Sequence, residues 1–67
     1  MAKIEKLKGI ILNSGMTMTA ISKKTGISRV TLYNRLNGIG EFTAPEIVAL
    51  TRVLHLTKAV RDEIFLT

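Results

Sequence analysis

Apolar residues recur along the chain at spacings of three and four, which places them on one side of an α-helix. The first stretch has Ile4, Leu7 and Ile11 at these spacings, and a later one has Ile47 and Leu50. Short polar stretches containing Gly, Ser or Thr separate these segments. The pattern therefore predicts one domain over residues 1–67 with no strand and five helices, at about residues 3–13, 18–25, 29–37, 44–55 and 58–66.

The polar stretches also supply signals that begin and end helices. Thr17, Ser28 and Thr57 each precede an apolar segment, where a hydroxyl can accept a hydrogen bond from a free backbone N–H of the first turn. The segment Thr43-Ala44-Pro45-Glu46 matches a capping box, with Pro in a turn where no hydrogen-bond donor is needed. Gly26 is expected to end the second helix.

The composition excludes several classes of protein and of site. There is no Cys, which excludes disulfides and thiolate sites, and a single His, His55, cannot form a zinc site alone. No run approaches the roughly 20 apolar residues of a membrane span, and the N-terminus lacks the apolar stretch of a secretion signal. We expect a soluble cytoplasmic protein with no cofactor, metal, membrane or small-molecule partner.

Basic residues are concentrated in the first part of the chain. Residues 1–40 hold seven Lys or Arg and one acid, a net charge of +6, whereas residues 41–67 carry a net charge of −1. A polyanion such as nucleic acid is the simplest partner for such a field. Enzymatic chemistry is not indicated, because the neighbouring acids Asp62 and Glu63 lie on adjacent faces of a terminal helix, and no nucleophile–base pair or Gly-rich phosphate loop is present.

The second and third predicted helices, with a three-residue turn around Gly26 between them, have the spacing of a helix-turn-helix. The stretch from Thr17 to Gly38 resembles the Cro/CI-type (XRE) helix-turn-helix family of phage and bacterial transcriptional regulators. The resemblance is carried by Lys23-Lys24-Thr25-Gly26-Ile27-Ser28, Thr31-Leu32 and Asn37-Gly38. It implies a compact, all-α, five-helix, lambda-repressor-like DNA-binding domain whose helix-turn-helix covers about residues 17–37.

Three positions depart from the family pattern. Met18 stands where the family often has a Gln that contacts a phosphate, and Ser22 stands where a small Ala is common. Arg35 stands where an apolar residue is common, so Leu36 is expected to supply that packing.

The resemblance also implies which side chains meet DNA. The third helix is expected to enter the major groove and to contact bases through Arg29, Val30, Tyr33 and Asn34. Phosphate contacts are expected from Thr17, Thr19, Lys24, Ser28 and Asn37. Two alternatives remain open, since Tyr33 equally fits the edge of the core, and Lys23 and Lys24 fit a solvated face.

The length is similar to that of a Cro-type repressor or of an excised N-terminal domain. The family resemblance implies a phage or prophage repressor that binds a pseudo-palindromic operator in the cytoplasm of a bacterial host cell, associated with the nucleoid. Such a site calls for a homodimer, even one that is weak and completed only on DNA. The expected dimerisation surface lies in residues 56–67, with Ile64, Phe65 and Leu66, although the same residues equally suit closing the core. The alternatives are an antitoxin-type autoregulator and a protein–protein module that has kept the fold.

Overall fold

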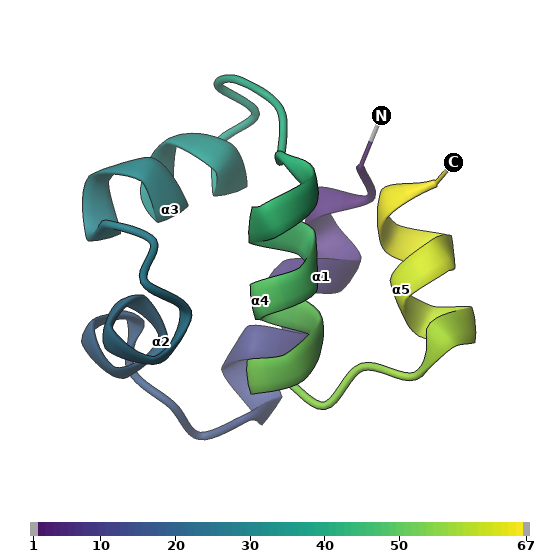
Figure 1. Cartoon of the computed structure of the whole chain (residues 1–67), viewed down its shortest axis with the longest axis horizontal. Helices are drawn as coiled ribbons and strands as arrows, with labels where there is room; N and C mark the ends of the chain where they lie inside the picture. The colour runs from purple at the N-terminus through teal and green to yellow at the C-terminus, as the bar shows by residue number, and fades with distance from the viewer. Residues whose placement is uncertain (1, 67) are drawn as a thin grey trace.

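The computed structural model describes residues 2–66 and forms five helices in that range. They are α1 (Ile4–Asn13), α2 (Met18–Thr25), α3 (Arg29–Leu36), α4 (Ala44–Val53) and α5 (Lys58–Phe65). In Figure 1, α4 runs through the middle of the view, with α2 and α3 on one side and α5 on the other. Helix α4 packs against α2 and α5, α3 packs against α2, and α1 packs against α5. The predicted all-α, five-helix architecture is therefore confirmed for the described residues.

The predicted N-caps are confirmed. The hydroxyls of Thr17, Ser28, Thr43 and Thr57 each accept a hydrogen bond from the backbone N–H three residues further on, at 3.1–3.4 Å. At Thr43 the capping box is complete, since Glu46 Oε1 accepts from the Thr43 N–H at 2.9 Å. Each such cap contributes about 1 kcal/mol to the stability of its helix. Four of the five helices begin directly after the cap residue that the sequence predicts.

Helices α1 and α2 end where the sequence predicts, at Asn13 and Thr25, whereas the other three C-terminal ends differ by one or two residues. Helices α3 and α5 end one residue early, at Leu36 and Phe65, and α4 ends at Val53 instead of near His55. His55 takes a positive φ of 55°, and the Leu56 N–H donates to the Thr51 carbonyl at 2.9 Å, which closes α4 in a Schellman motif. The sequence placed this end within two residues but did not indicate the left-handed conformation of His55, because a Gly or Asn usually marks that position.

Every helix contributes one side chain to the centre of the core. Leu7, Ile21, Leu32, Leu50 and Ile64 are each less than 2% exposed. Burying one such side chain contributes about 1.5–3 kcal/mol. The core therefore holds all five helices together, α3 included.

The burial of Ile64 corrects one sequence-based expectation. Its side chain is 0% exposed inside the monomer, so it has no surface to offer to a second copy. Phe65 is half-buried, with its ring 5.3 Å from that of Phe42 in an edge-to-face arrangement, whereas Leu66 is exposed. None of the helices found in residues 2–66 is long and apolar enough to cross a membrane.

Candidate nucleic-acid interface

The turn between α2 and α3 is held by side chains of α2. Gly26 ends α2 with φ +78°, in the left-handed region that side chains other than that of Gly resist. Ser22 Oγ donates to the Ile27 carbonyl at 2.6 Å, and Thr25 Oγ1 accepts from the Ile27 N–H at 3.2 Å. These bonds fix where α3 begins relative to α2. The sequence pattern does not reveal this role of Thr25, because it depends on the path of the turn.

Helix α3 is buried along one face and open along the other. Leu32 and Leu36 are buried, which confirms that Leu36 supplies the packing that Arg35 does not. The helical period gathers Val30, Tyr33, Asn34 and Asn37 on one face beside this buried stripe, with Arg29, at the first position of the helix, at the edge of that face. Val30 is 70% exposed and Tyr33 is 51% exposed, Arg29 is exposed, and Asn34 is half-buried. An apolar and an aromatic side chain thus lie in solvent on one short helix.

Arg29 lies at the N-terminus of α3 and reaches toward α2. Its Nη1 donates to Thr19 Oγ1 at 3.3 Å, so the structure brings a predicted base contact and a predicted phosphate contact together. The dipole of α3 opposes a positive charge at this end of the helix. An acceptor or anion supplied from outside would therefore stabilise Arg29 more than its present surroundings do.

The predicted phosphate contacts lie at exposed positions with different local roles. The hydroxyls of Thr17 and Ser28 cap α2 and α3, and Ser28 Oγ also donates to Thr31 Oγ1 at 3.0 Å. The Lys24 ammonium is exposed and lies 3.9 Å from the sulfur of Met16. Helix N-termini with free N–H groups favour phosphate oxygens, so both caps stand at suitable places. The Thr17 hydroxyl accepts in its cap and keeps its O–H as a donor, whereas the Ser28 hydroxyl already donates to Thr31.

The distribution of ion pairs leaves the helix-turn-helix positively charged. Within residues 2–66 the ion pairs are Lys6–Glu63, Lys8–Glu5, Arg35–Glu46 and Arg61–Asp62, at 2.8–3.6 Å. No acidic residue lies between Glu5 and Glu41 in the sequence. In the described structure Lys23, Lys24 and Arg29 have no carboxylate partner, so the field around α2 and α3 is available to an anion.

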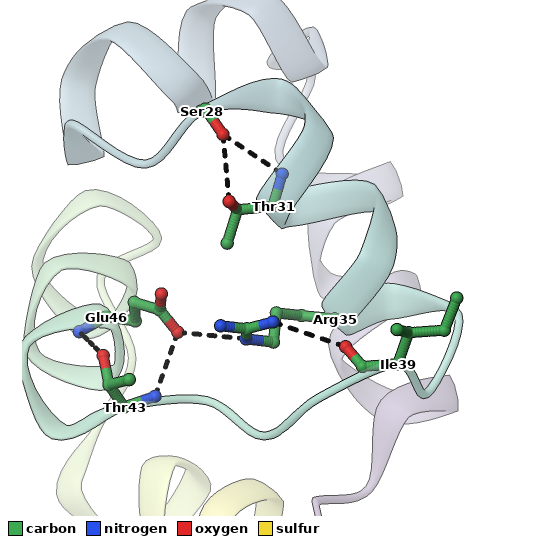
Figure 2. Close-up of polar contacts among 6 residues, drawn as sticks. All are labelled: Ser28, Thr31, Arg35, Ile39, Thr43 and Glu46. Carbon is green, nitrogen blue, oxygen red and sulfur yellow. Dashed lines mark hydrogen bonds and ion pairs between the residues drawn. The ribbon is translucent and has the colours of Figure 1, made fainter.

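Arg35 has a structural role that the sequence did not reveal. It lies on the side of α3 away from Val30 and points toward the N-terminus of α4, where Figure 2 shows it between Glu46 and the loop that contains Ile39. The sequence identified Arg35 only as a departure from the family pattern. In the part of the chain that the structure covers, no group of three or more His, Asp or Glu side chains is arranged to hold a metal ion.

Comparison with known proteins agrees with this geometry. A family model described as helix-turn-helix matches residues 7–60, which include α2, the turn, α3 and α4. No individual curated protein and no solved structure matches the chain. The match covers well over half of the 67 residues. The chain therefore belongs to the Cro/CI-type (XRE) helix-turn-helix family of DNA-binding transcription regulators.

Proposed function

We propose that this protein is a sequence-specific repressor of the Cro type, from a phage or prophage, that binds a pseudo-palindromic operator with α3 in the major groove. The observation that carries the proposal is the open face of α3, where Val30 and Tyr33 are 70% and 51% exposed beside Arg29. A folded domain of this size does not gain stability by leaving such side chains in water. Their exposure is explained if a base-pair surface covers them.

Each residue of this face has chemistry suited to a base edge. The Arg29 guanidinium matches O6 and N7 of guanine, and the Asn34 amide matches N6 and N7 of adenine. Val30 suits a thymine methyl group, and Tyr33 suits a methyl group, a base edge or a phosphate. The N-termini of α2 and α3, capped by Thr17 and Ser28, would lie against phosphates, with Thr19, Lys24 and Asn37 as further phosphate contacts.

A single α3 helix contacts too few base pairs to define a unique site. Two copies on half-sites about 34 Å apart double the sequence that is read, and they explain why the operator would be pseudo-palindromic. Leu66, at 72% exposure, and the half-buried Phe65 are the proposed dimer contacts. With so little apolar surface available there, dimerisation is weak in solution and is completed on DNA. Repression follows if the operator overlaps a site that polymerase needs.

Selection from a pool of randomised duplexes at two salt concentrations tests the proposal. We expect enrichment of a pseudo-palindrome, with an affinity that falls steeply as salt rises. Salt-dependent binding without enrichment would contradict sequence specificity, and the absence of binding at low salt would favour a protein–protein module.

Two matched variants test whether α3 is the helix that reads the DNA sequence. Val30 and Val48 are both exposed valines, at 70% and 62%, but Val48 lies on α4. We expect Val30→Ser to change the selected sequence at one position in each half-site and Val48→Ser to leave it unchanged. The reverse outcome would place the reading surface on α4.

A further inference from the structure

The side chain of Arg35 connects three parts of the molecule. Its Nε donates to Glu46 Oε1 at 3.4 Å, and its Nη1 donates to the Ile39 carbonyl at 3.4 Å (Figure 2). The same Glu46 oxygen accepts from the Thr43 N–H at 2.9 Å. Arg35 thereby ties the second half of α3 to the loop that follows it and, through Glu46, to the capping box of α4.

Both charged side chains are largely shielded from water. The Arg35 side chain is 21% exposed and that of Glu46 is 16% exposed. The guanidinium also lies close against the loop, since a Cβ at Gly40 would be 2.5 Å from Arg35 Nη1. A side chain at position 40 would displace the end of the Arg35 side chain, and the φ of +75° favours Gly at this position. A shielded ion pair is screened by salt much less than an exposed one, so this contact persists under conditions that weaken surface pairs.

The contact joins elements that have little other packing between them. Helix α3 packs against α2, whereas α4 packs against α2 and α5. Leu32 and Leu36 hold α3 to the core along one line, and a helix held along one line can tilt about it. Base contacts tolerate displacements of only about 0.5 Å and 10–20°. A second attachment at the far end of α3 would remove this freedom.

We infer that Arg35 and Glu46 form a brace that sets the angle at which α3 presents its open face. Both are positioning residues for sequence reading, and Arg35, although it is a cation on the DNA-reading helix, is not a phosphate contact. The inference rests on the proposed function, because it assigns these residues a part in DNA selectivity.

The test compares Arg35→Met, Glu46→Gln and their combination with Glu41→Gln as the matched control. Gln at position 46 retains an oxygen acceptor for the capping box while removing the charge. Glu41→Gln removes the same charge from the loop that leads into α4, but Glu41 has no ion pair in the described structure. Circular-dichroism melting establishes that each variant is folded.

We expect Arg35→Met and Glu46→Gln each to lower the ratio of affinity for the selected site to affinity for random duplex by about tenfold, the size of one impaired base contact. The double variant should lose no more than either single variant, and Glu41→Gln should keep the wild-type ratio. If Arg35 instead contacted a phosphate directly, Glu46→Gln would release Arg35 and raise the affinity for both duplexes. Arg35→Met would then weaken both equally and reduce the salt slope by about one, and that result overturns the inference.

Amide hydrogen exchange in the free protein tests whether Arg35 and Glu46 hold the loop after α3. The Ile39 N–H donates to the Asn34 carbonyl at 2.8 Å, next to the carbonyl that Arg35 holds. We expect this amide to exchange faster in Arg35→Met and Glu46→Gln than in the wild type, and unchanged exchange overturns the brace. If the wild type selects no sequence from the duplex pool, the proposed function fails, and the role of Arg35 and Glu46 in selectivity fails with it. In that case, faster exchange in the variants still shows that the contact between Arg35 and the loop was correctly identified.

Discussion

Replacing Arg29 by Ala is expected to impair DNA reading while leaving the fold almost unchanged. The side chain is exposed, and its hydrogen bond to Thr19 at 3.3 Å joins two exposed groups. Losing such a bond costs about 0.5–1.5 kcal/mol, while removing a cation from a helix N-terminus recovers about 0.3–1 kcal/mol. The free energy of unfolding should therefore change by less than about 1 kcal/mol.

The binding effect should be larger and confined to one base pair. A bidentate arginine–guanine contact contributes about 1–3 kcal/mol of discrimination, a factor of roughly 5 to 150. Fluorescence anisotropy with the selected duplex, its single-base variants at the guanine and a random duplex measures this discrimination for each protein. Arg29→Lys is the control, because it keeps the charge but lacks the planar fork.

We expect both variants of Arg29 to lose discrimination at a single position, and Arg29→Lys to keep the wild-type affinity for random duplex. The reasoning is refuted if Arg29→Ala weakens binding to every duplex by the same factor and Lys restores it. Arg29 would then be a phosphate contact, and the base contacts of α3 would have to come from Val30, Tyr33 and Asn34.

Three further substitutions test the fold. Leu50→Ala, at a side chain with 0% exposure, should lower the free energy of unfolding by about 2–5 kcal/mol, whereas Leu12→Ala, at 81% exposure, should have little effect in the same urea titration. Thr57→Ala should cost about 1 kcal/mol through loss of the cap on α5; a Thr57→Ser variant equally destabilised would show that the hydroxyl is not responsible. The Lys6 ammonium lowers the pKa of the Glu63 carboxyl by hydrogen bonding and by its charge, so the stability from this pair is present above pH 4.5 and is lost as the pH falls through the lowered value. Acid titrations of the wild type and of Glu63→Gln should diverge in that range, and identical curves would exclude the contribution.

The sequence was informative wherever the structure is decided locally. Hydroxyl caps at Thr17, Ser28, Thr43 and Thr57 act within three residues, so they could be identified without knowledge of the fold. The open face of α3 was predictable in part, because helical periodicity separates Leu32 and Leu36 from Val30 and Tyr33. Whether Tyr33 lies at the edge of the core depends on tertiary packing and could not be predicted. In the structure its side chain is 51% exposed, so about half of it remains open to a partner.

Features that depend on the path of a loop or on the packing of a helix end could not be predicted. The Arg35–Glu46 pair joins residues 11 positions apart across a loop, so no local rule brings them together. The left-handed His55 is not announced by a glycine. Ile64 shares an apolar stripe with Phe65, and a stripe on a short terminal helix does not distinguish the core from an interface. Packing of α5 against α1 and α4 decides the question by burying Ile64 completely.

The structure separates the residues that fold α3 from those that we propose to read DNA. Leu32 and Leu36 attach the helix to the core, and Arg35 attaches its far end to α4, all on sides away from the open face. Val30 is 70% exposed and contributes little buried surface, so its replacement removes little of the apolar burial that stabilises the domain. Under the proposed function, the preferred operator can therefore change through the open face while the scaffold that orients it stays the same.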